Sequence, residues 1–314
     1  MIMRSAETCS LRVPEGIRIL FTGLSAFPLT PLQDDAVDEA SFSALVRRLA
    51  ASEVDSIAVL GSTGSYAYLS PEERRRVVQL AAAHKGSKPL IVGVGALRTS
   101  QVLANVRCAE EAGAAGILLA PVSYQVLTDE DVYGLFRDVT AATDLPVIVY
   151  DNPGTTHFKF STALYGKITE LPGIASLKIP PVSAASAAAR VEEVRAVIPE
   201  HVTIGISGDA AAADALNAGC DAWYSVLAGT LPEPACRIMR AVTEARHDDA
   251  AAESARLSPL WKLFAEHGSL RVIAATAEHL GLAAQNCLPL PVRGLEAEER
   301  RQVAAAVESL GLTA

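Results

Sequence analysis

The sequence has 314 residues, of which half are hydrophobic and only 5% aromatic, and its formal net charge is −9. This length allows one large domain or two ordinary ones, and the acidic balance argues against non-specific binding to nucleic acid or to anionic membranes. No run of about 18 apolar residues marks a membrane span. The start of the chain also lacks the apolar core of a signal peptide, so we expect a cytoplasmic protein.

Eight short apolar runs recur along the chain and predict strands. They are Ile17–Ala26, Ser56–Leu60, Pro89–Val94, Gly116–Ala120, Pro146–Tyr150, Gly173–Ile179, Val202–Ser207 and Asp221–Leu227. Strands that alternate with helices pair in parallel, and continuous hydrophobicity indicates burial on both faces. Eight such units match a (β/α)8 TIM barrel, whose usual size is about 250 residues. The alternative is a doubly wound open sheet, but its glycine-rich dinucleotide fingerprint is absent.

Amphipathic patterns between and after these runs predict helices. They cover Ala40–Ala51, Ser70–Lys85, Thr99–Ala112, Thr128–Ala142, Ala184–Val197, Asp209–Ala218, Leu231–Arg246, Ala250–His267, Leu270–Leu282 and Leu295–Ser309. Ser70 and Thr128 are N-cap residues in these patterns. The first helix after Gly229 is expected to complete the barrel, and the other three to form an appendage.

These patterns divide the chain into three parts. Residues 1–15 are expected to be a flexible N-terminal extension. Residues 16–246 form the barrel and carry the catalytic site, and residues 247–314 form a C-terminal domain of three helices.

Lys178 lies near the end of the apolar run Gly173–Ile179. An ammonium group is costly to desolvate there, so the lysine needs partners or has a lowered pKa. A neutral lysine is the nucleophile of Schiff-base chemistry. Taken alone, such a lysine more often extends into water or pairs with a carboxylate.

Two further strand ends point to the same pocket as this lysine. Tyr150 ends one apolar run, and the turn Gly61, Ser62, Thr63 and Gly64 follows another. Glycines let backbone N–H groups approach an anion closely, so we expect this turn to hold a carboxylate. Because the catalytic groups of a barrel lie at the C-terminal ends of its strands, the three segments should converge on one site.

The remaining polar residues, the histidines and the cysteines give weaker indications of function. Ser207 and Asp209 either cap a strand-to-helix turn or contact substrate hydroxyls at the barrel mouth. The histidines have no metal-ligand spacing, so no metal site is predicted, and His157 is expected in a loop or the substrate pocket. The five cysteines are scattered and indicate buried thiols in a reducing compartment: Cys9, Cys108, Cys220, Cys236 and Cys287.

Four segments carry a family resemblance in their order and spacing: Ala26–Pro31, Gly61–Gly64, Tyr150–Pro153 and Leu177–Lys178. The chain resembles the dihydrodipicolinate synthase / N-acetylneuraminate lyase family of class I aldolases. The resemblance implies a barrel with a C-terminal helical domain. It also implies a homotetramer or homodimer that acts on pyruvate or another 2-keto acid through a lysine imine, without a cofactor.

The resemblance also implies roles for single residues. Lys178 would form the Schiff base, Tyr150 would shuttle protons, and Ser62 would pass protons to Tyr150. Thr63, with Gly61, Gly64 and nearby backbone N–H groups, would hold the pyruvate carboxylate. Substrate contacts are expected at Ser207, Asp209 and Thr155. Tyr124 is either a relay group donated across a dimer or a surface tyrosine.

Three departures from the family pattern concern the substrate. Ser65 stands where an acid is often found, Thr155 where the lysine-biosynthetic synthases carry an arginine, and Ala210 where sialic acid lyases carry an acid. They favour cleavage or formation of a C–C bond in a hydroxylated 2-keto acid. The alternatives are a keto-sugar-acid dehydratase that uses the same imine, a true dihydrodipicolinate synthase, and a barrel that binds a small acid without turnover.

Overall fold

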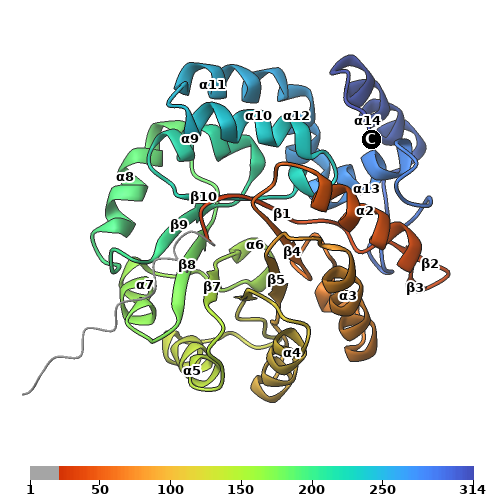
Figure 1. Ribbon diagram of the computed structural model, residues 1–314. Coiled ribbons are helices and arrows are strands. Elements are labelled where there is room, and N and C mark those ends of the chain that lie inside the picture. The colour runs from red at the N-terminus through yellow and green to blue at the C-terminus, as the bar shows by residue number, and fades with distance from the viewer. Residues whose placement is uncertain (1–20) are drawn as a thin grey trace, which may run out of the picture.

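Eight strands form a closed parallel barrel in the computed structural model, which describes residues 21–314 (Figure 1). In chain order they are β1 (Gly23–Ala26), β4 (Ser56–Val59), β5 (Leu90–Gly93), β6 (Gly116–Leu119), β7 (Val147–Tyr150), β8 (Ile174–Ile179), β9 (Thr203–Ile206) and β10 (Ala222–Ser225). Each strand pairs in parallel with the next of this series, and β10 closes on β1. The predicted TIM barrel is confirmed.

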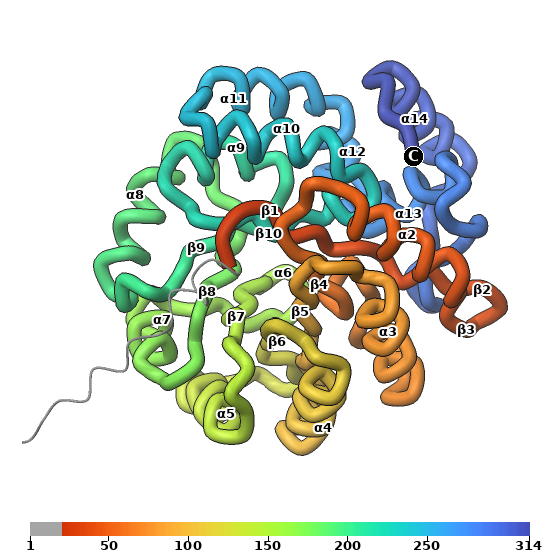
Figure 2. Tube along the Cα trace, in the orientation of Figure 1, coloured from red at the N-terminus to blue at the C-terminus, as the bar shows by residue number. Residues whose placement is uncertain are grey.

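Helices surround the barrel and cover its outer face (Figure 2). They are α2 (Glu39–Ala51), α3 (Pro71–His84), α4 (Thr99–Glu111), α5 (Asp129–Thr140), α7 (Thr162–Thr169), α8 (Ala184–Arg195), α9 (Ala212–Asn217) and α10 (Pro232–Thr243). The short helix α6 (Pro153–Thr156) instead lies inside this ring of helices, directly after β7 (Figure 2). Three short 3₁₀ turns complete the loops: η1 (Tyr66–Tyr68), η2 (Asp209–Ala211) and η3 (Leu227–Gly229). The sequence patterns do not predict α6 and α7, which together connect β7 to β8.

The predicted caps set the starts of two helices. The Ser70 hydroxyl accepts the Glu73 backbone N–H, and the Glu73 carboxylate accepts the Ser70 N–H. Thr128 and Asp131 make the same reciprocal pair at the start of α5. Each pair satisfies backbone N–H groups that have no partner within the helix.

Four helices follow α10: α11 (His247–Arg256), α12 (Ser258–His267), α13 (Ser269–His279) and α14 (Ala297–Ser309). The sequence analysis expected three, with a single helix over Ala250–His267. The chain breaks there because Pro259 has no N–H to donate into a continuing helix, but fits the first turn of α12. The hairpin β2 (Leu32–Gln33) and β3 (Ala36–Val37) lies beside this region, where the Leu32 N–H donates to the Cys287 carbonyl (Figure 2).

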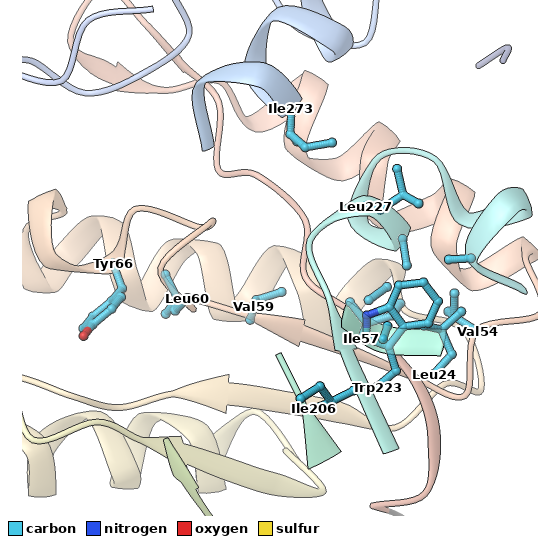
Figure 3. Packing of buried hydrophobic residues seen from close by; sticks show 14 of the residues in the cluster. Leu24, Val54, Ile57, Val59, Leu60, Tyr66, Ile206, Trp223, Leu227 and Ile273 are labelled. Carbon is cyan, nitrogen blue, oxygen red and sulfur yellow. The ribbon is translucent and has the colours of Figure 1, made fainter. Parts of the chain in front are cut away.

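Buried side chains form two clusters, one on each side of the barrel wall. The outer cluster packs strands against helices and includes Leu24, Ile57 and Trp223 (Figure 3). The inner cluster fills the barrel and includes Ile148 and Tyr224. Neighbouring residues of one strand fall into different clusters because side chains alternate between the two faces.

Several expectations concern the start of the chain. The extension over residues 1–15, Cys9 and the first residues of the predicted strand Ile17–Ala26 lie outside the described residues. The division of the chain at residue 246 stays a prediction. Within residues 21–314, no helix has both the length and the apolar character that crossing a bilayer requires.

Candidate active site

Tyr150 and Lys178 meet inside the barrel near the carboxyl ends of two neighbouring strands. Tyr150 is the last residue of β7, and Lys178 is its register partner on β8. Only 3% of Lys178 is exposed, and Tyr150 belongs to the inner cluster. Both side chains therefore lie where the functional groups of a TIM barrel are found.

Three aromatic rings surround the Lys178 nitrogen. Its distances to the ring centroids are 3.8 Å for Phe27, 4.3 Å for Tyr150 and 5.7 Å for Tyr224. Burial among them lowers the pKa of Lys178 to about 7, and the negative charge of Asp209 opposes this shift. At neutral pH a large fraction of the amine is consequently uncharged, which is the form that attacks a carbonyl.

Phe27 and Tyr224 are site residues that the sequence analysis missed. Gly205, the register partner of Lys178 on β9, makes room for the Tyr224 ring. A Cβ at this glycine would lie 2.2 Å from a carbon of that ring. The Tyr224 hydroxyl in turn shares a 2.7 Å hydrogen bond with the Ser176 hydroxyl. The signal for this packing is an unexplained glycine inside an apolar run.

The Tyr150 hydroxyl has two polar neighbours. It shares a 3.2 Å hydrogen bond with the Ser62 hydroxyl and accepts a 2.8 Å hydrogen bond from the Asn152 side-chain amide. Burial raises the pKa of Tyr150, while both hydrogen bonds oppose the rise because they stabilise the phenolate. The sequence analysis named Ser62 but missed Asn152, whose place two residues after Tyr150 was the available signal.

The turn after β4 borders the same cavity. Ser62, Thr63 and Ser65 line it, and the Ser65 hydroxyl oxygen is buried without a hydrogen-bond partner among the described residues. Gly61 and Gly64 are outside the lining set. A Cβ at Gly61 would lie 2.7 Å from the Phe27 ring, so this glycine lets the turn pack closely against Phe27. The same ring lies beside the Lys178 nitrogen.

Asp209 is the first residue of η2 and is only 3% exposed. Its carboxylate accepts hydrogen bonds from Trp223 Nε1 at 3.0 Å, Ser225 Oγ at 2.7 Å and the Leu227 N–H at 3.1 Å. Burial raises its pKa, and these donors and the charge of Lys178 oppose the rise. Both carboxylate oxygens thus hold β10 and η3, although the residue also borders the cavity.

The cavity has a volume of about 700 Å³. Besides Lys178 and Tyr150, it is lined by the predicted contacts Ser207 and Thr155. Tyr124 is 90% exposed and is outside the lining set. Within one chain, the structure therefore brings together most predicted site residues and leaves Tyr124 apart.

The His157 backbone has φ = 58°, at the end of α6, and the residue is outside the cavity lining. In the part of the chain that the structure describes, no group of three or more histidine, cysteine, aspartate or glutamate side chains is arranged to hold a metal ion.

A model of the dihydrodipicolinate synthetase family matches residues 20–310. The chain belongs to this family. The dihydrodipicolinate synthase of Agrobacterium tumefaciens strain C58 has a crystal structure that is 45% identical, with a TM-score of 0.91, and the match covers 94% of this chain and 99% of that one. The 4-hydroxy-tetrahydrodipicolinate synthase of Phenylobacterium zucineum strain HLK1 is 29% identical over 93% of this chain and 98% of its own.

A third similar structure, at 24% identity and a TM-score of 0.84, is the chloride-inhibited dihydrodipicolinate synthase of Acinetobacter baumannii in complex with pyruvate. The match covers 93% of this chain and 99% of that one, and at this identity it concerns the fold. Membership in the dihydrodipicolinate synthetase family makes the protein an enzyme of the aldolase and lyase type. The resemblance and the enzyme class expected from the sequence are both confirmed.

Proposed function

We propose that the protein makes or cleaves a C–C bond next to a pyruvate unit through an imine on Lys178. The observation that supports this most is the aromatic enclosure of Lys178, in which burial lowers its pKa to about 7. A lysine that served only to bind an anion would need its positive charge. Because burial disfavours the charged amine, such a lysine would be expected in a less buried position.

Tyr150 is the proposed proton shuttle of this reaction. It would protonate the carbinolamine hydroxyl, which then leaves as water during imine formation, and it would later take up or return a proton during C–C bond making or cleavage. Ser62 lies within hydrogen-bond distance of its hydroxyl and would relay protons. The Asn152 amide would support the phenolate formed between these steps.

The turn after β4 is the proposed site for the carboxylate of the 2-keto acid. Thr63 borders the cavity, and the buried Ser65 hydroxyl would donate its unused hydrogen bond to the bound anion. The pyruvate in the A. baumannii synthase supports the choice of this acid. Two carboxylate contacts would orient the ketone toward Lys178.

The two relatives at 45% and 29% identity are named as synthases, so a synthase is the second candidate for this chain. We favour a 4-hydroxy-2-oxo acid, because Thr155 stands where a synthase arginine is expected and a neutral hydroxyl binds a carboxylate less strongly than a guanidinium. A dehydratase that uses the same imine remains an alternative, and so does a non-catalytic small-acid-binding barrel. A coupled assay with pyruvate and aspartate semialdehyde separates the synthase from the others.

We propose in addition that the enzyme is a cytoplasmic homotetramer or homodimer, as the family resemblance implies. Tyr124 is 90% exposed in one chain, which leaves it available to a partner subunit. Sedimentation of the purified protein tests this. A monomer near the chain mass of 32.9 kDa would remove any role for Tyr124 in the relay.

Trapping of the imine tests the main proposal. Borohydride added with pyruvate should attach a reduced pyruvyl group to Lys178, detected by intact mass and peptide mapping. Lys178→Ala and Lys178→Arg should both abolish the adduct, since a guanidinium stays protonated and cannot attack. Lys167→Ala is the matched control, because Lys167 is exposed and pairs with Glu130. An unmodified wild-type enzyme across a panel of 2-keto acids would refute the proposal.

A further inference from the structure

The outer wall of the active-site cavity is apolar and comes largely from the C-terminal helices. Trp261 and Phe264 lie on α12 with ring centroids 5.5 Å apart, and Leu270 follows on α13. Val226, between β10 and η3, borders the same cavity. Trp261 Nε1 donates to the Ser254 carbonyl at 2.8 Å, so the indole requires no polar partner from a ligand.

Charged groups are scarce around this cavity. Among the lining residues that the structure describes, only Lys178 and Asp209 have ionisable acid or amine groups. The first is the proposed nucleophile, and the second already accepts three hydrogen bonds from the protein. A carboxylate on the distal part of a substrate would lose its water without gaining a cation.

Two hydroxyl groups of the rim are also engaged within the protein. Ser207 Oγ donates to the Ile179 carbonyl at 2.8 Å, and Thr155 Oγ1 donates to the Asn152 carbonyl at 3.4 Å. A hydroxyl has one proton to donate. At these two hydroxyls a polyhydroxylated group would find acceptor lone pairs but no free proton, so it would regain there only part of its hydrogen bonds to water.

We propose that the distal half of the substrate is an uncharged aryl or branched alkyl group that packs against Trp261 and Phe264. The substrate would then be a 4-hydroxy-2-oxo acid with an apolar group on C4, and its second product an apolar aldehyde. This inference rests on the proposed lysine imine and adds the substrate class. The aromatic pair supplies the apolar area that such a group needs.

In the cleavage direction, the reaction would pass through an imine and then an enamine on Lys178. The Lys178 amine adds to C2, and water leaves with the Tyr150 proton. The Tyr150 phenolate then removes the C4 hydroxyl proton, the C3–C4 bond breaks, and its electron pair passes to the iminium to give an enamine and the aldehyde. Protonation at C3 and hydrolysis release pyruvate and the free lysine, so no oxidant or reductant is needed.

A comparison of aldehydes in the addition direction tests the inference. Pyruvate would be combined with benzaldehyde, 3-methylbutanal, glyceraldehyde or succinic semialdehyde, and kcat/KM measured for each. We expect both apolar aldehydes to exceed the hydroxylated and the charged one by tenfold or more. Trp261→Ala and Phe264→Ala should each raise KM for benzaldehyde about tenfold. Lys262→Ala is the matched control, because Lys262 is exposed on the same helix and outside the cavity lining.

A cation placed in the wall should reverse the preference. Phe264→Arg should raise kcat/KM for succinic semialdehyde and lower it for benzaldehyde. Circular dichroism and borohydride trapping with pyruvate would accompany every variant. Together they show whether a variant is folded and still forms the imine.

The outcomes separate the two proposals. Without a pyruvate adduct in the wild type, the proposed function fails, and the inference with it. If the adduct forms but succinic semialdehyde or glyceraldehyde is preferred, the inference alone is wrong. If the adduct forms and no aldehyde reacts, the proposed C–C bond chemistry is wrong as well. The inference is also wrong if Trp261→Ala changes the sedimentation coefficient but not the aldehyde preference, because the aromatic pair would then be an interface between copies of the chain.

Discussion

Tyr150 and Lys178 are register partners on adjacent strands, and the lysine nitrogen lies 4.3 Å from the centre of the phenol ring. One aromatic residue thus has two effects. Its ring helps to keep water from the amine, and its hydroxyl reaches Ser62 and Asn152. Because both residues belong to short strands of a closed barrel, the pairing of these strands sets the position of one residue relative to the other.

Replacement of Tyr150 by phenylalanine separates the effect of its ring from the effect of its hydroxyl. Tyr150→Phe keeps the ring beside Lys178 and removes the hydroxyl, so we expect turnover to fall by about 10²- to 10⁴-fold. Trapping with pyruvate should still occur at long incubation, and the melting temperature should change little. Full activity in Tyr150→Phe would show that another group moves the protons.

Removal of the Asn152 amide tests a contact that the sequence did not reveal. A donor to a phenolate contributes about 1.5–3 kcal/mol, so Asn152→Ala should lower kcat by roughly ten- to a hundredfold with little change in the KM for pyruvate. Asn217→Ala is the matched control, because Asn217 contacts His247 on the surface. An unchanged kcat would show that the amide does not support the phenolate.

The lowered pKa of Lys178 predicts a pH profile for adduct formation. The amine must be neutral to attack, so the rate should rise with pH to a plateau above about 7. Asp209→Asn removes the negative charge that raises the pKa of Lys178, and should therefore move the rise to lower pH. Stopped-flow or quenched trapping measures the profile. The exposed Asp138 provides the control Asp138→Asn, and a shift in the opposite direction would contradict the electrostatic argument.

Lys178 also predicts a pH dependence of stability. Between about pH 7 and the ordinary lysine pKa of 10.5, the unfolded chain holds a proton that the folded chain has lost. The free energy of unfolding should therefore rise with pH through this window, by about 1.4 kcal/mol per pKa unit of the shift. Lys178→Met should be more stable than the wild type near pH 7 and lose that advantage toward pH 10. Urea unfolding at several pH values measures both, and an advantage that grows with pH would contradict the assignment.

The strands could be predicted because each is buried on both faces. The apolar runs at Ser56–Leu60 and Pro146–Tyr150 agree with β4 and β7 to within one residue. Local capping signals at Ser70 and Thr128 also agree with the structure, since they act over three residues of chain. The break between α11 and α12 was missed because amphipathic periodicity continues across it.

The residues of the candidate site, too, could be predicted only in part. Lys178, Tyr150 and Ser62 could be named in advance because a barrel brings the ends of its strands to one face. Phe27, Gly205 and Tyr224 could not, because their importance lies in contacts between β9, β10 and the loop after β1.

The sequence by itself determined the barrel, the family and the residue types at the strand ends, because hydrophobic periodicity and short motifs are local properties of a chain. Only the tertiary structure decided which groups surround the lysine and what forms the outer wall. Desolvation depends on everything that packs around a group, and Trp261 lies more than 80 positions from Lys178 in the sequence. The pKa of the amine and the apolar character of the cavity therefore arise only when distant segments fold together.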